Sequence, residues 1–182
     1  IDVSDFETLL PNPLRQFPFE LDNFQKQAVV RLENRECIFV TTHPSAGKTA
    51  IAEYAIAMAA QHVMRAVYTA PTRLMLHQKF CEFKESFGED AVGLLMGDVC
   101  IRPDAPCVVM TTEVLRSLLY RGAPLVRDLE WVVFDEAHLQ TQPSNNDDEQ
   151  WGGVWEEVMV MLPAHANFVC LSAIRPNTVE VC

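Results

Sequence analysis

Eight consecutive residues have the types and spacing of a phosphate-binding loop: Thr42-His43-Pro44-Ser45-Ala46-Gly47-Lys48-Thr49. Glycine lets a backbone approach phosphate oxygens closely, and the amide groups at a helix N-terminus attract them. We expect Lys48 to reach the β- and γ-phosphates and Thr49 to ligate Mg²⁺. The loop therefore predicts a site for a nucleoside triphosphate and magnesium. Its expected nucleotide-binding residues are Pro44, Ser45, Ala46, Gly47, Lys48 and Thr49.

The segments on either side of this loop have the patterns of a strand and a helix. Residues 37–41 form an apolar, β-prone run, and residues 50–61 are Ala-rich with apolar side chains at helical spacing. Thr42 stands where the simplest form of the motif has glycine. A surface loop that contains Gly-Lys-Thr by chance is the alternative, and the strand–loop–helix context disfavours it.

An acidic pair, Asp135-Glu136, directly follows the apolar run 131–134. We expect Asp135 to hold Mg²⁺, usually through water, and Glu136 to orient or deprotonate the water that attacks the γ-phosphate. Adjacent residues of an extended chain point to opposite sides, so the following turn must aim the second carboxylate. Without the phosphate loop, the same pair would be a solvated acidic turn. With it, the pair predicts hydrolysis of the nucleotide.

The composition bounds the kind of protein. A chain of 182 residues can bury one good core, so we expect one domain. Hydrophobic residues make up 49%, with no apolar run near the length of a membrane span, which disfavours membrane insertion and disorder. The net charge of −11 is opposite in sign to a broad nucleic-acid-binding surface, so any such contact must be local. The start, Ile1-Asp2-Val3, suggests a segment of a longer chain.

The six cysteines include no CxxC pair, and the five histidines lack metal-ligand spacing, which disfavours a zinc site. Cys37, Cys107 and Cys170 lie in apolar runs, so we expect them to be buried thiols in a reducing compartment. The three tryptophans are expected in the core or as loop anchors.

Short apolar strands that alternate with helices predict an α/β fold, with a parallel β-sheet and helices on both faces. Residues 1–18 form an expected irregular leader with a helical turn at 6–10. Ligands of such sheets bind at the carboxyl ends of the strands, where the polar clusters of this chain fall. The expected strands are 37–41, 66–70, 92–96, 107–110, 131–134 and 168–171, and the expected helices are 23–35, 50–61, 74–87, 114–120 and 153–162.

Five motifs, in this order along the chain, resemble those of the superfamily 2 DExH RNA helicases. They are FELDNFQKQA (19–28), SAGKT with AEYA (45–49 and 52–55), MTTEVLR (110–116), DEAH (135–138) and VWEE (154–157). The run RDLEW (127–131) resembles the superkiller (Ski) branch of that family. The resemblance implies a RecA-like P-loop domain at residues 19–182, which is the first, ATP-binding lobe, without the second.

The same resemblance implies a function and partners. The expected function is an ATP-dependent 3′-to-5′ RNA helicase that feeds single-stranded RNA, without sequence preference, to the exosome. The implied partners are the exosome and superkiller-complex subunits, namely a tetratricopeptide-repeat scaffold and a WD-repeat protein. The expected location is the cytoplasm, with the nucleus as the alternative. The isolated lobe should be nearly inactive, because arginine fingers of the second lobe stabilise the transition state.

The resemblance also assigns residues. Phe19 would stack on the adenine and Gln25 would hydrogen-bond its edge. His138 would couple the nucleotide site to the RNA side, which makes the expected catalytic residues Lys48, Asp135, Glu136 and His138. Contacts to the RNA backbone position a strand without reading its sequence. The residues that match this backbone path are Pro71, Thr72, Arg73, Gly97, Asp98, Thr111, Thr112 and Arg116.

Three departures from the family pattern qualify these expectations. Ile174 replaces a threonine whose hydroxyl helps to link hydrolysis to strand movement, residues 140–150 form a longer polar stretch, and Ala137 replaces a valine. A degenerate nucleotide-binding scaffold and a DNA helicase of the same superfamily are therefore alternatives. The intact Lys48 and Glu136 favour an enzyme over a scaffold.

Overall fold

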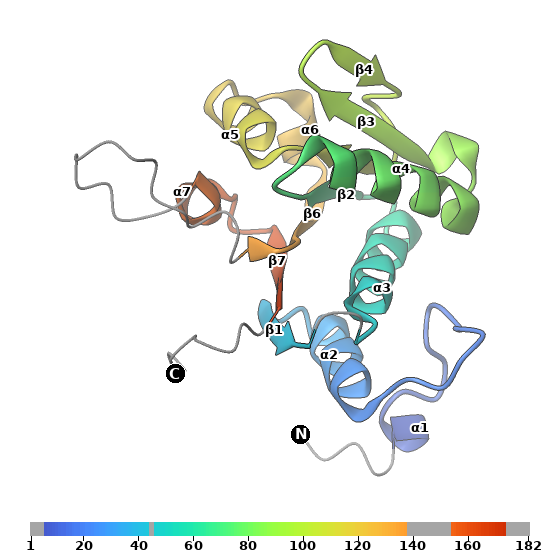
Figure 1. Cartoon of the computed structure of the whole chain (residues 1–182). Helices are drawn as coiled ribbons and strands as arrows, with labels where there is room; N and C mark the ends of the chain where they lie inside the picture. Colours follow the sequence, from blue (N-terminus) through green and yellow to red (C-terminus); the bar gives the residue numbers. More distant parts are fainter. Residues whose placement is uncertain (1–5, 44–45, 138–153, 174–182) are drawn as a thin grey trace.

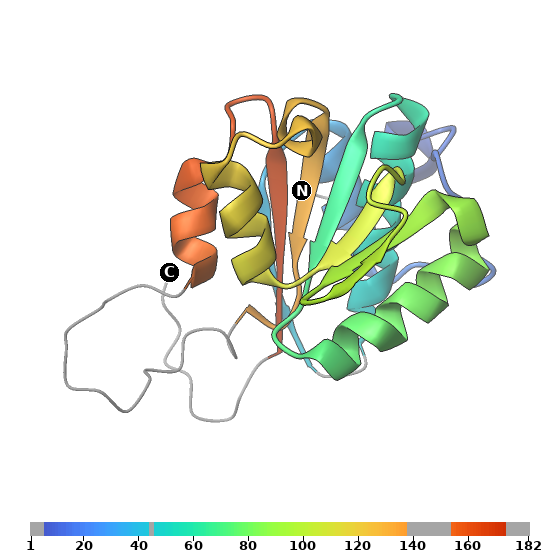
Figure 2. The same cartoon turned by 90° about the horizontal axis from the view of Figure 1, so that it is seen from above.

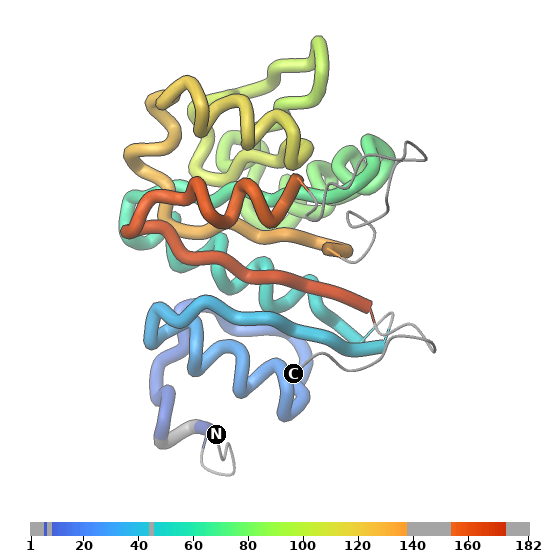
Figure 3. The backbone as a smooth tube through the Cα atoms, turned by 90° about the vertical axis from the view of Figure 1, so that its left-hand side faces the viewer, coloured from blue at the N-terminus to red at the C-terminus, as the bar shows by residue number. Residues whose placement is uncertain are grey.

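The computed structural model describes residues 6–43, 46–137 and 154–173, which include a seven-stranded sheet in the order β1-β7-β6-β2-β5-β3-β4 (Figure 1). All neighbouring strands are parallel except β3 and β4. Figure 3 shows β1, β7 and β6 side by side. The strands are β1 (Ile38–Thr42), β2 (Arg65–Thr69), β3 (Val92–Met96), β4 (Val99–Ile101), β5 (Cys107–Met110), β6 (Leu129–Phe134) and β7 (Asn167–Ala173).

Helices cover both faces of the sheet, as predicted (Figure 2). The alternation of side chains along each strand divides the core: Trp131 and Val133 of β6 face one cluster, and Val132 and Phe134 face the other. The first cluster packs under α2 (Asn23–Glu33), α3 (Lys48–Gln61) and α4 (Arg73–Phe87), which the 3₁₀ turn η1 (Glu89–Ala91) follows. The second packs under α5 (Thr112–Tyr120), α6 (Pro124–Arg127) and α7 (Val154–Met161).

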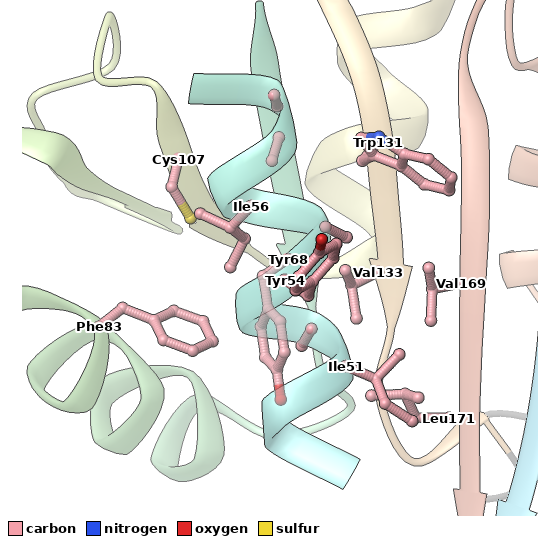
Figure 4. Close-up of a cluster of buried hydrophobic side chains, with 14 of the residues drawn as sticks. Ile51, Tyr54, Ile56, Tyr68, Phe83, Cys107, Trp131, Val133, Val169 and Leu171 are labelled. Carbon is pink, nitrogen blue, oxygen red and sulfur yellow. The ribbon is translucent and has the colours of Figure 1, made fainter. Parts of the chain in front are cut away.

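The central helix α3 is buried on nearly all sides, which explains its alanine content. Ile51, Tyr54 and Met58 are buried in the first cluster, where Figure 4 labels Ile51 and Tyr54, and small alanines let neighbouring elements approach closely. Two tryptophan predictions are confirmed, because Trp131 is fully buried and the Trp155 ring lies 6.4 Å from that of Phe134. The third tryptophan, Trp151, lies outside the described residues.

The leader is packed against the domain from residue 6 onward. The expected helical turn is α1 (Phe6–Leu9), and irregular chain follows it. The backbone N–H of Leu14 donates to the Tyr54 hydroxyl at 3.1 Å, and Arg15 pairs with Glu53 at 2.9 Å. The Arg15 guanidinium also lies 4.5 Å from the centre of the Phe87 ring. Residues 10–18 therefore belong to the same packed body as α3 and α4.

The predicted parallel sheet is confirmed for six strands, whereas strand β4 was not predicted and the prediction for Cys37 is wrong. The sheet is not wholly parallel, because β4 folds back antiparallel on β3 and forms an edge. The strand β4 is only three residues long and mostly exposed, so its apolar residues are too few to indicate a strand in the sequence. Cys37 is exposed, whereas Cys107 and Cys170 are buried as expected. Cys37 precedes β1, the other edge strand, whose residues are not all covered. No helix in the described ranges is long and apolar enough to cross a membrane.

Candidate nucleotide-binding site

Three helix N-termini lie at one edge of the sheet. Helix α3 follows β1, α4 follows β2 and α5 follows β5, and these strands run in the same direction (Figure 2). Each helix therefore starts at the carboxyl edge of the sheet, where its free N–H groups carry a partial positive charge. This edge attracts phosphate groups locally even though the chain carries a net charge of −11.

The phosphate loop leads directly into α3. Gly47 is the N-cap residue with φ +81°, a left-handed conformation that glycine adopts without strain. Lys48 is the first helical residue and is only 8% exposed, and its Nζ lies 3.5 Å from the His43 carbonyl oxygen. The Ala46 backbone N–H donates to the same carbonyl at 3.3 Å, so the His43 carbonyl accepts from both sides of the described loop. Two predicted loop residues, Pro44 and Ser45, lie outside the described part of the chain.

Gln25 connects helix α2 to this loop. Its Oε1 accepts the Asp22 backbone N–H at 2.8 Å, and its Nε2 donates to the Gly47 carbonyl at 2.9 Å. With 3% of its surface exposed, Gln25 is held at both ends inside the fold. The expected contact to the adenine edge stays a prediction, and the structure adds a role in supporting the loop. Phe19 is 53% exposed beside Phe17, so one ring face is available for the predicted stacking on adenine.

The acidic pair is oriented by hydrogen bonds at the end of β6. The Asp135 backbone donates to the Thr69 carbonyl of β2 at 2.9 Å, which anchors the start of the turn. Asp135 Oδ1 accepts the Glu136 backbone N–H at 3.0 Å, and Oδ2 accepts the hydroxyl of Tyr68. Glu136 has φ +49°, so the chain turns sharply at this residue. This turn is the feature that the sequence argument required to aim the second carboxylate.

Tyr68, on β2, is a site residue that sequence reasoning missed. It is 1% exposed, and this burial, together with the negative charges of Asp135, Glu82 and Glu136, raises the pKa of Tyr68 well above its ordinary value. The hydroxyl therefore stays protonated and donates to Asp135 across the physiological range. No sequence signal could have marked it, because a tyrosine in an apolar strand looks like any other core residue.

Lys79, on α4, is a second missed residue. Its Nζ donates to Thr49 Oγ1 at 2.9 Å and to Glu82 Oε2 at 2.7 Å. Burial opposes ionisation of Glu82, but hydrogen bonds from Lys79 and Gln78 outweigh that effect and lower the pKa of Glu82. A charged pair thus adjoins the hydroxyl that was predicted to bind Mg²⁺. In the sequence, Lys79 looks like one of several charged residues on a surface helix.

The donor set suits magnesium bound together with a nucleotide. Within the described ranges, no group of three or more His, Cys, Asp or Glu side chains could hold a metal ion alone. Mg²⁺ is usually held by one or two protein oxygens plus phosphates and water, rather than by an all-protein cage. The Thr49 hydroxyl and the Asp135 carboxylate fit such a shared site. Zinc, which prefers nitrogen and sulfur ligands, does not fit it.

The residues predicted to follow RNA gather in part. Arg73 and Gly97 are neighbours, since a Cβ added to Gly97 would lie 3.0 Å from Arg73 Nη2. The hydroxyls of Thr72 and Thr111 cap α4 and α5, where each accepts a backbone N–H of the first helical turn. Pro71 and Asp98 adjoin these residues in the chain, at the carboxyl ends of β2 and β3. The structure thus groups the predicted contacts that follow β2 and β3.

Two predicted RNA contacts differ from this group. Thr112 is only 3% exposed, which argues against a direct contact of its side chain with RNA. Arg116 pairs with Glu157 of α7 at 3.0 Å, and the Tyr120 hydroxyl donates to the same carboxylate. A phosphate that bound Arg116 would compete with this ion pair. His138, Ile174 and the polar stretch 140–150 lie outside the described residues, so their predicted roles stay predictions.

The family model described as DEAD/DEAH box helicase matches residues 22–181. Among curated proteins, the chain is 53% identical over 178 residues to the antiviral helicase SKI2 of Saccharomyces cerevisiae and 56% identical over 180 residues to the DExH-box ATP-dependent RNA helicase DExH11 of Arabidopsis thaliana. It is 52% identical over 178 residues to human superkiller complex protein 2. Each match covers 98% of this chain, but only 13% of the first two relatives and 14% of the third.

Among solved structures, the DUF1998 helicase MrfA bound to DNA and AMPPNP is similar in fold. The TM-score is 0.67 at 20% sequence identity, and the match covers 94% of this chain and 26% of MrfA. This likeness supports the RecA-like fold.

Proposed function

The chain belongs to the DEAD/DEAH box helicase family, and from this premise we propose that it is the ATP-binding motor lobe of an ATP-dependent RNA helicase. The chain spans about one eighth of the relatives' length (13%), so the proposed activity is that of a longer protein. The observation that carries the proposal is the convergence of the phosphate loop and the Asp135-Glu136 turn at one edge of the sheet.

Each residue of this edge has a distinct proposed task. Lys48, at the start of α3, binds the β- and γ-phosphates together with the loop amides. Thr49 and Asp135 supply oxygen ligands for Mg²⁺, which neutralises charge on the phosphate oxygens when it is bound. Glu136 orients the attacking water and accepts its proton, and its left-handed backbone conformation gives the sharp turn at this position.

On the RNA side, we propose that Arg73 and its neighbours at the ends of β2 and β3 contact the phosphate backbone of a single strand. Contacts of this kind give affinity without sequence preference. By resemblance to the superkiller branch, we further propose 3′-to-5′ movement and delivery of RNA to the exosome. The proposed partners are a tetratricopeptide-repeat scaffold and a WD-repeat subunit, and the proposed location is the cytoplasm, with the nucleus as the alternative.

Two alternatives make different predictions. A degenerate scaffold would have no physical need for the whole set Lys48, Thr49, Asp135 and Glu136, so their presence favours an enzyme. A DNA helicase would share the phosphate site, and only the likeness to relatives named as RNA helicases or as a superkiller protein argues against it.

The test is duplex unwinding by the longer protein with Mg-ATP. The substrates are RNA duplexes with a 3′ or a 5′ single-stranded overhang, and DNA duplexes of the same sequence. We expect unwinding of the RNA duplex with the 3′ overhang. Preference for DNA, or for the 5′ overhang, would contradict the proposed substrate or direction respectively. The lobe alone should unwind none of them.

A further inference from the structure

The carboxylate of Asp135 owes its orientation partly to a tyrosine that nothing in the motif pattern marks. Tyr68 donates its hydroxyl hydrogen to Asp135 Oδ2, while the Glu136 N–H binds Oδ1 at 3.0 Å. Each carboxylate oxygen thus accepts a hydrogen bond from a different direction. A carboxylate held in this way has fewer rotamers to lose when it binds a metal ion.

We propose that Tyr68 is a positioning residue of the magnesium site, one that fixes the Asp135 carboxylate for metal binding. The inference rests on the proposed function, because it assumes that Asp135 binds Mg²⁺ together with ATP. Tyr68 touches neither the nucleotide nor the metal in this account. It acts only through Asp135.

The surroundings of Tyr68 make its hydroxyl a fixed donor. The ring extends from β2 on the face under α3 and α4, and strand pairing sets Tyr68 beside Val133 of β6, two residues before Asp135 (Figure 4). Phe83 of α4 packs edge-on against the ring, with centroids 5.1 Å apart and an interplanar angle of 82°. Both aromatic rings are almost fully buried. A tyrosine ring has only two side-chain torsions, so packing the ring also places the hydroxyl.

The second predicted metal ligand is supported in the same manner. Thr49 Oγ1 accepts a hydrogen bond from Lys79 of α4 at 2.9 Å, and Glu82 holds that lysine at 2.7 Å. Lys79, Glu82 and Phe83 all belong to α4. One helix therefore steadies both predicted metal ligands, directly at Thr49 and through the Tyr68 ring at Asp135.

The chain contains a matched control for Tyr68. Tyr54 of α3 is equally buried, and its hydroxyl also donates to a carboxylate, that of Glu33. The Tyr54 hydroxyl accepts the Leu14 N–H at 3.1 Å, so it links the leader to α2 and α3 rather than to the acidic turn. Tyr68→Phe and Tyr54→Phe each remove one buried hydroxyl bound to a carboxylate. Only the first change affects the predicted metal site.

The experiment measures binding of a fluorescent ATP analogue to the chain, over a range of Mg²⁺ concentrations and in EDTA, with thermal unfolding recorded for each variant. We expect Tyr68→Phe to weaken the Mg²⁺-dependent part of nucleotide affinity about 10-fold, the lower end of the range for partners of metal ligands. Its affinity in EDTA should stay within about twofold of wild type, because the loop contacts to the phosphates are intact. Tyr54→Phe should lower the unfolding temperature but keep the wild-type dependence on Mg²⁺.

Four results would overturn the inference. A folded Tyr68→Phe variant with wild-type Mg²⁺ dependence would do so, as would an equal loss in Tyr54→Phe. If Tyr68→Phe does not fold, Phe83→Leu loosens the tyrosine ring while its hydroxyl is kept. The Phe83→Leu variant should lose a smaller part of the Mg²⁺-dependent nucleotide affinity than is expected for Tyr68→Phe. A Phe83→Leu variant with the full wild-type Mg²⁺ dependence would contradict the inference. The fourth result is a wild-type chain that binds the nucleotide equally with and without Mg²⁺, which would overturn the proposed function as well.

Discussion

Replacing Gly47 by alanine tests whether Gln25 truly braces the phosphate loop. The change has two costs in the structure. Alanine at φ +81° is strained by about 1 to 2 kcal/mol. The new Cβ would also lie 2.6 Å from Gln25 Nε2, so the buried amide must move and lose its bond to the Gly47 carbonyl. A buried polar group left without its partner costs about 1 to 3 kcal/mol, so we expect a total loss of about 2 to 5 kcal/mol.

The assay is urea unfolding of the chain, in which the Gly47→Ala variant is compared with a variant of a control glycine. The comparison holds where both variants keep the same dependence of unfolding free energy on urea concentration. Gly122 has φ +60°, and a Cβ added there would meet open space, so Gly122→Ala should cost only the strain of about 1 to 2 kcal/mol. In a Gln25→Ala background, Gly47→Ala should become as cheap as Gly122→Ala, because the clash is gone. Equal costs for the two glycine variants in the wild-type background would refute the bracing role of Gln25.

The remaining predictions concern the RNA side and the charged pair beside Thr49. Arg73→Met should weaken single-stranded RNA binding for all sequences and reduce the slope of log affinity against log salt by about 0.7, as for one lost phosphate contact. Arg121→Met, at the far end of α5, should leave both unchanged, and a shared loss would argue against a specific path. For Glu82, the folded pKa lies below the ordinary 4.5, so its stabilising contribution is present above that pH and is lost as the pH falls through the folded pKa. The difference in unfolding midpoint between wild type and Lys79→Met should therefore be largest above about pH 5 and should shrink as the pH falls through the folded pKa of Glu82, whereas a constant difference would contradict the role of the pair.

The parts of this fold that could be predicted are those with a local sequence signal. The apolar runs of β5 and β6 and the helical spacing of apolar residues in α3 each indicate a buried element. The order of strands and helices can therefore be predicted from the sequence. Because ligands of parallel sheets bind at the carboxyl ends of the strands, the phosphate loop and Asp135-Glu136 are predicted to lie together. The short exposed strand β4 has no such signal, and its antiparallel pairing with β3 depends on a turn between two modest segments.

The supporting residues of the site could not be predicted, for a different reason. Tyr68 and Lys79 act through partners 67 and 30 positions away in the chain, so their roles exist only after the sheet and α4 have packed. Arg116 is the opposite case, in which the sequence motif predicts a ligand contact and long-range packing supplies a different partner. Its type and motif favour a phosphate contact, but Glu157 of α7, 41 positions away, takes its guanidinium. A motif specifies which residues meet the ligand, whereas long-range packing decides what holds them.

The most direct test of the central claim is RNA-stimulated ATP hydrolysis by the longer protein, measured beside its Glu136→Gln and Ile174→Thr variants. We expect stimulation by RNA rather than DNA, and a loss of about 10²-fold or more in Glu136→Gln with ATP binding retained. A gain in Ile174→Thr would show that coupling is weakened by the isoleucine. Hydrolysis that is unchanged in Glu136→Gln, or absent in the wild-type protein while ATP still binds, would contradict the account.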